Sequence, residues 1–146
     1  MEHMMKTYKR GDRIPVRAQQ IWLILTAHAV LKPNRDYEEG GGWSGWGLGL
    51  ITYGDLAEQM GMDRQAANTL SKHLGVVGLF CQQESLPPLN VIVVNGDSGQ
   101  PGFGVVETKG FEKDQERVWS TDWFSFRPPT IRALRAVYDE HFALRT

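Results

Sequence analysis

Three residues in the second half of the chain are of the types that metal-assisted cleavage of a phosphodiester requires. Asp97 follows a run of β-branched residues, and Glu107 and Lys109 follow a second pair of valines. Two carboxylates can hold Mg²⁺, and a lysine beside the metal can stabilise the charge that develops on a phosphate during hydrolysis. The spacing of these three residues therefore allows nuclease chemistry.

The order of an aspartate, a gap and Glu-x-Lys resembles the core of the PD-(D/E)xK nucleases. Asp97 also stands in a glycine-containing turn, where aspartate is common, and a lysine such as Lys109 discourages strand addition at a hairpin edge. The four histidines show no metal-ligand spacing, and the single cysteine, Cys81, excludes a disulfide and a cysteine zinc site. We therefore expect a non-catalytic protein without a cofactor, with the Mg²⁺-dependent nuclease as one alternative.

A second set of residues could bind a ligand rather than transform it. Gln65 and Asn68 are three positions apart in a helical pattern, so their side chains share one face, and Lys72 extends that face. Glutamine and asparagine amides can each form two hydrogen bonds with adenine in the major groove of DNA, and a lysine can bind a phosphate. Residues 64–73 would then be a recognition helix; the simpler interpretation is a solvated surface helix.

Local signals predict the helices that carry these residues. Thr52 and Asp55 form a Thr-x-x-Asp pattern, in which each side chain can accept a hydrogen bond from a backbone amide of the first helical turn. Gly61 stands where a helix C-terminus needs a left-handed residue, and Asp63 can cap the next helix. These signals predict a helix-turn-helix whose second helix is 64–73.

The sequence after this motif predicts a third helix over residues 76–83 and then changes character at a double proline. The β-branched run Asn90 to Val94 is typical of a buried strand, and Asn95-Gly96 predicts a turn. Residues 105–108 can return as a second strand. A strand, a glycine-rich loop and a strand after a helix-turn-helix form the arrangement of a wing.

The flanking segments complete a predicted α+β single domain. An amphipathic helix is expected from Ala18 to Leu31, and a last helix is expected with Pro129 in its first turn. Residues 1–17 are interpreted as a basic N-terminal arm. Residues 18–146 are then one winged-helix-like domain.

A glycine-rich segment interrupts the helical patterns, since glycine occupies six of the eleven residues from Gly40 to Leu50. Glycine raises the entropy cost of ordering a helix, so we expect a surface loop over residues 40–49. Its Trp43 and Trp46 either bind a protein partner or fold back onto the core. A winged helix that docks another protein through this loop is therefore the second alternative function.

The stretch TYGDLAEQMG, followed by RQAANTL, LPPL and a valine strand with a glycine-rich turn, resembles a known family over residues 51–104. It is similar to the DNA-binding domain of O6-alkylguanine-DNA alkyltransferases and of alkyltransferase-like proteins, which lack the reactive cysteine. The resemblance implies that Tyr53 presses on a phosphate at an extruded nucleotide and that Arg64 replaces its base in the stack. Because LPPLNVIVV contains neither cysteine nor histidine, alkyl transfer is excluded.

The composition limits the choice of partners. The hydrophobic content of 41% is enough for a core, and the net charge of −1 provides no global attraction to phosphate, so any DNA contact must come from a local patch. No apolar run has the length of a signal peptide or a membrane span, and we expect a cytoplasmic protein that does not enter a membrane. The combined prediction is a DNA-binding winged helix with these contact residues: Tyr53, Arg64, Gln65, Asn68 and Lys72.

Overall fold

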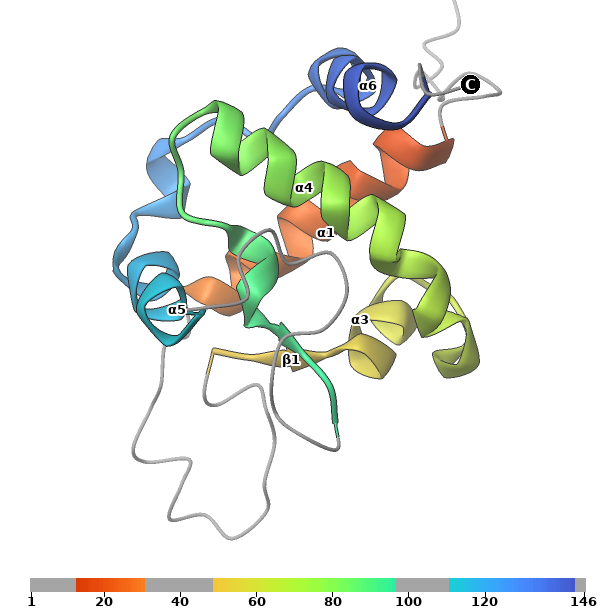
Figure 1. Ribbon diagram of the computed structural model, residues 1–146. Helices are drawn as coiled ribbons and strands as arrows, with labels where there is room; N and C mark the ends of the chain where they lie inside the picture. The colour runs from red at the N-terminus through yellow and green to blue at the C-terminus, as the bar shows by residue number, and fades with distance from the viewer. Residues whose placement is uncertain (1–12, 31–48, 97–110, 144–146) are drawn as a thin grey trace, which may run out of the picture.

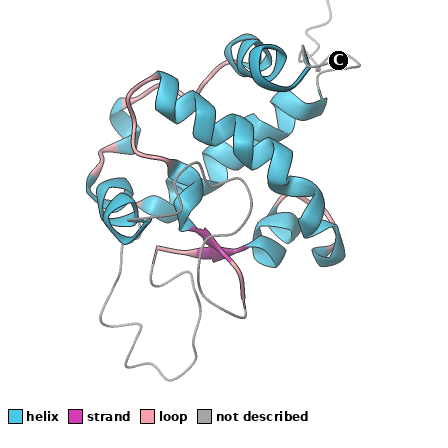
Figure 2. Ribbon diagram, viewed as in Figure 1, coloured by secondary structure: helices cyan, strands magenta, loops and turns pink. Residues whose placement is uncertain are grey.

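The computed structural model describes residues 13–30, 49–96 and 111–143. Within these ranges the chain is mostly helical and contains one small sheet of two parallel strands (Figures 1 and 2). This content is compatible with an α+β domain. The sequence predictions that lie outside the described ranges concern residues 1–12, the loop 40–48, the strand 105–108, and Trp43, Trp46, Asp97, Glu107 and Lys109.

Two long helices, α1 (Arg13–Ala29) and α4 (Ser71–Gln83), cross at the centre of the structure, and α6 (Ile131–Tyr138) packs against both (Figure 1). In the view of Figure 1, α6 lies at the top, whereas the sheet and α3 (Tyr53–Gln59) lie at the bottom. The helix α5 (Phe111–Ser120) covers the segment that leads into the second strand. The core therefore lies where α1, α4 and α6 meet, and the sheet joins α3 to it.

Helix α1 begins at Arg13, five residues before the predicted start at Ala18. Pro15 is accommodated because it lies in the first helical turn, where a missing backbone N–H breaks no helical hydrogen bond. The buried apolar side chains recur every three or four residues, as the periodicity of the sequence predicts. These buried side chains include Ala18, Ile21, Trp22, Leu25 and Ala29.

The predicted signals around α3 are confirmed, with one difference. The Thr52 hydroxyl accepts a hydrogen bond from the Asp55 backbone amide at 3.1 Å, and Gly61 has a φ of 79° after the end of the helix. The Asp63 carboxylate accepts from the Gln65 amide, also at 3.1 Å. The difference is that the Asp55 carboxylate pairs with Arg64, so Thr52 alone provides the side-chain cap.

The prediction of one helix over 64–73 and a separate helix over 76–83 is wrong. The chain forms a 3-10 helix, η2 (Arg64–Leu70), which continues at once into α4. The Thr69 hydroxyl donates to the Ala66 carbonyl three residues earlier at 2.7 Å, a local bond that competes with the α-helical pattern. Residues 64–73 therefore span a junction between two kinds of helix.

The predicted strand over Asn90 to Val94 is largely wrong as well. A 3-10 helix, η3 (Leu89–Ile92), occupies most of it, and only β2 (Val93–Val94) is extended. This strand pairs in parallel with β1 (Ile51–Thr52), with Ile51 opposite Val93 and Thr52 opposite Val94. The predicted wing would continue into residues that the structure does not describe.

Neighbouring side chains explain why this buried segment is not a longer strand. The Val91 amide donates to the Pro88 carbonyl at 3.1 Å, which closes a turn, and the Gln115 side-chain amide donates to the Val91 carbonyl at 2.9 Å. Asn90 lies against Gly78, where an added Cβ would come within 2.9 Å of Asn90 Nδ2. The β-branched residues of this segment are therefore buried without forming a strand. Their neighbours are α4, through Gly78, and α5, through Gln115.

The C-terminal third consists of α5, a short 3-10 helix η4 (Trp123–Ser125), α6 and a π-helical end η5 (Asp139–Ala143). The predicted last helix is confirmed, but it begins at Ile131, so Pro129 precedes the helix and does not lie in its first turn. The Thr130 hydroxyl caps α6 by accepting from the Ala133 amide at 3.0 Å. None of the helices in the described ranges has the length and hydropathy that crossing a membrane requires.

Candidate functional site

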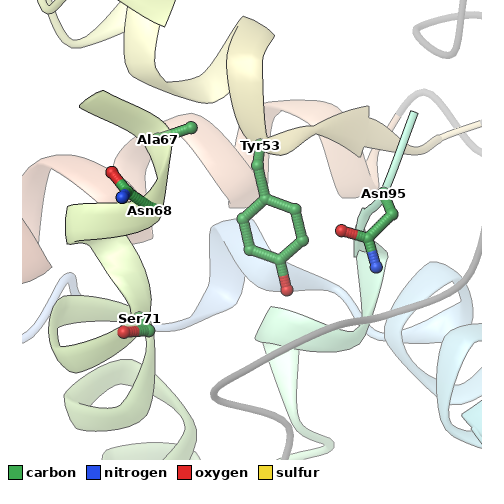
Figure 3. Close-up of a pocket in the computed structure, with 5 residues that line it drawn as sticks. All are labelled: Tyr53, Ala67, Asn68, Ser71 and Asn95. Atoms are coloured by element: carbon green, nitrogen blue, oxygen red, sulfur yellow. The ribbon is translucent and has the colours of Figure 1, made fainter. Parts of the chain in front are cut away.

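A cleft of about 470 Å³ opens between the start of α3, the η2–α4 junction and the end of β2. Figure 3 shows the Tyr53 ring standing between the side chains of the junction and that of Asn95. The volume falls within the range of about 300–1,000 Å³ that is usual for small-molecule sites. The described side chains that line it are Tyr53, Ala67, Asn68, Ser71 and Asn95.

The register of the small sheet brings two of these residues together from distant parts of the sequence. Because Thr52 pairs with Val94, the next residue on each strand, Tyr53 and Asn95, leave the sheet side by side. The Thr52 cap then fixes Tyr53 as the first residue of α3. Asn95 was interpreted from the sequence only as a turn residue, since a parallel pairing with β1 has no local signal.

The 3-10 geometry of η2 positions the other wall of the cleft. Side chains three residues apart eclipse one another in a 3-10 helix, which places Gln65, Asn68 and the junction residue Ser71 along one line. Asn68 and Ser71 border the cleft, whereas Leu70 and Leu74 point into the core. The sequence does not predict Ser71 as a site residue, because its position at the cleft depends on η2 being a 3-10 helix and not an α-helix.

The polar side chains predicted as a recognition surface are directed outward. Gln65, Asn68 and Lys72 are exposed, and we call these three residues the ridge. The ridge runs along η2 into the first turn of α4, beside the cleft, so that Asn68 belongs to both. Tyr53 is half-buried and faces the cleft from α3.

Arg64 occupies a different position from the other predicted contact residues. Its guanidinium forms ion pairs with Asp55 and Glu58 of α3, and these hydrogen bonds raise the pKa of Arg64 above its ordinary value. It lies so close to Gly54 that an added Cβ would be 2.6 Å from Arg64 Nη2. Arg64 is thus held against α3, and it is not among the described residues that line the cleft.

The remaining nucleophilic and metal-binding candidates do not form a reactive site in the described part of the chain. Burial raises the pKa of the Cys81 thiol to about 12, so the thiolate is scarce at neutral pH. Among the residues described, no group of three or more histidine, cysteine, aspartate or glutamate side chains could hold a metal ion. Asp97, Glu107 and Lys109 of the alternative nuclease site lie outside the described ranges.

Comparison of the chain with protein-family models, with curated proteins and with solved structures finds no match. The ridge and the cleft are therefore the features from which a function can be inferred.

Proposed function

We propose that the protein binds duplex DNA without catalysing a reaction on it, and that the ridge enters the major groove. The observation that carries the proposal is the exposure of Gln65, Asn68 and Lys72 on the outside of η2 and of the first turn of α4. In this orientation the two amides are available for adenine edges, and the lysine is available for a phosphate. The fold that suits this function is a winged helix, whose wing would follow Asn95.

We also propose that the cleft accommodates a nucleotide, and the resemblance to alkyltransferase-like proteins supports this. An extruded nucleotide requires a pocket with a surface for stacking and polar groups for the edge of the base. Tyr53 offers an aromatic face, and Asn95 places a side-chain amide beside it (Figure 3). The cleft beside the ridge would therefore receive a nucleotide from the duplex that the ridge binds.

Arg64 has a different role in this proposal from the one that the resemblance implies. Entry of Arg64 into the base stack would leave Asp55 and Glu58 without their cation. With the ion pairs intact, Arg64 offsets part of the negative charge on α3 that would otherwise repel a phosphate backbone. We therefore assign Arg64 to the support of the surface rather than to the stack.

Fluorescence anisotropy with labelled duplexes of random and of adenine-rich sequence tests this function. Gln65→Ala with Asn68→Ala should reduce the preference between sequences, because each lost pair of hydrogen bonds to a base removes about 1–3 kcal/mol of discrimination. Gln82→Ala with Gln83→Ala is the matched control, since both glutamines are exposed at the far end of α4. Absence of binding to any duplex at low salt would end the proposal.

A further inference from the structure

A second polar feature lies on the other side of the ridge, where the N-terminal half of α1 packs against the first turns of α4 (Figure 1). Arg13 and Arg17 are four residues apart on α1, so both side chains lie on one face of that helix. Lys72 projects from the first turn of α4, and His73 follows it. The two helices thus bring three cations and an imidazole together from positions almost 60 residues apart in the sequence.

Arg17 is anchored beside the helix-turn-helix by an uncharged partner. Its Nη1 atom donates to the sulfur of Met62 at 2.7 Å, and Met62 lies in the turn between α3 and η2. A thioether is a weak acceptor and carries no charge, so this contact leaves the charge of the guanidinium unneutralised. In the part of the chain that the structure describes, no carboxylate forms an ion pair with Arg13, Arg17 or Lys72.

His73 provides an independent observation at the same place. Its side chain is only 7% exposed, and its Nδ1 atom has no hydrogen-bond partner among the described residues. Buried polar atoms are nearly always paired in folded proteins, so an unpaired ring nitrogen among charged neighbours is an exception at this place. Burial, together with Arg17, Arg13 and Lys72, lowers the pKa of His73 to about 4, so the ring is uncharged at neutral pH.

We propose that Arg13, Arg17 and Lys72 form an anion site, next to the buried His73, that binds a phosphate of the DNA backbone beside the ridge. The three cations provide the charge, and the buried, neutral His73 ring lies next to them, where its signals report on a bound anion. This inference rests on the proposed function, and it names the source of positive charge that the helix-turn-helix itself lacks. Segment 51–75 contains three acidic and two basic residues, and α1 supplies two more cations.

The position of the site fits one strand of a duplex. Lys72 belongs to the ridge and to the cluster, so a groove that receives Gln65 and Asn68 has its phosphates next to Lys72 and Arg17. Contacts to phosphates fix the orientation of a protein on DNA, whereas contacts to base edges read the sequence. The cluster would therefore set the register of the ridge without contributing sequence preference.

The salt dependence of duplex binding tests the inference. Arg13→Gln with Arg17→Gln should weaken binding to all sequences alike and make the slope of log K against log salt concentration shallower by about one. Arg117→Gln with Arg132→Gln is the matched control, because it removes two exposed arginines from α5 and α6 and should leave the slope unchanged. An equal slope for the two double variants, each shown to be folded by circular dichroism, would overturn the anion site.

A second arm separates failure of this site from failure of DNA binding. Inorganic phosphate is added at constant ionic strength while the ring signals of His73 are followed by NMR, with His141 of η5 as the internal reference. The His73 signals should shift in the unmodified protein and stay in place in Arg13→Gln with Arg17→Gln. If no duplex binds but the His73 signals shift with phosphate, the anion site is supported and the DNA-binding function is refuted. If no duplex binds and the signals do not shift, both are refuted. If duplexes bind, the salt-dependence slopes of the two double variants show whether the anion site contacts the DNA.

Discussion

Lowering the pH from 7 to 5 should destabilise the protein through His73. The pKa of this histidine is lowered to about 4 in the folded chain, from an ordinary value of 6.5. As the pH falls below 6.5, the unfolded chain takes up the proton first, and the folded chain follows only near pH 4. The stabilisation contributed by the neutral ring is therefore present above pH 6.5 and is lost on the way down to pH 4.

The size of the effect follows from these two pKa values. At pH 5 the ring is almost fully protonated in the unfolded chain and mostly neutral in the folded one. The free energy of unfolding should therefore be about 2 kcal/mol lower than at pH 7 from this residue alone. That is a large share of the stability of a domain, which is about 5–15 kcal/mol.

Urea unfolding followed by circular dichroism at pH 7 and at pH 5 measures the change. Burial also lowers the pKa of His28, so the part due to His73 must be isolated. His73→Phe keeps a ring of similar size and removes the titration, and its loss of stability between the two pH values should be about 2 kcal/mol smaller. The same loss in both proteins would show that His73 is not held neutral by burial and the nearby cations.

Three further changes test the positioning of the site. Thr52→Ala should cost about 1 kcal/mol of unfolding free energy, and Thr130→Ala at α6 a similar amount; no loss for Thr52→Ala would contradict its role as the cap beneath Tyr53. Gln115→Leu should cost about 1–3 kcal/mol by leaving the Val91 carbonyl unpaired, and an unchanged urea midpoint would refute that account. The Cys81 thiol should resist a disulfide reagent at pH 8 until urea unfolds the chain, and rapid labelling of the folded protein would contradict its burial.

Sequence reasoning succeeded where the signal is local. Thr52, Gly61 and Asp63 each act within three residues of their own position, and each adopts the predicted capping role. The last helix was likewise predicted from its apolar stripe, although Pro129 precedes the helix and does not lie in its first turn. Short-range hydrogen bonds and backbone preferences are therefore sufficient to predict the turn that precedes the ridge.

Sequence reasoning failed where a distant contact decides the conformation. The β-branched composition of residues 90–94 reports burial, but it does not reveal that the Val91 carbonyl is bonded to the distant Gln115 side chain and not to a neighbouring strand. The pairing of Arg64 with Asp55 crosses the turn, so its spacing in the sequence did not reveal it. The charge count of a segment also omits cations such as Arg17 that another helix brings alongside.

An NMR titration of the labelled protein with a short duplex tests the central claim most directly, because it shows which surface the DNA contacts. The account predicts that the backbone amide signals of Gln65, Asn68, Lys72 and Tyr53 shift progressively with added duplex, while that of Gln82 at the far end of α4 does not. Shifts confined to α5 and α6, or no shifts at low salt, would contradict it.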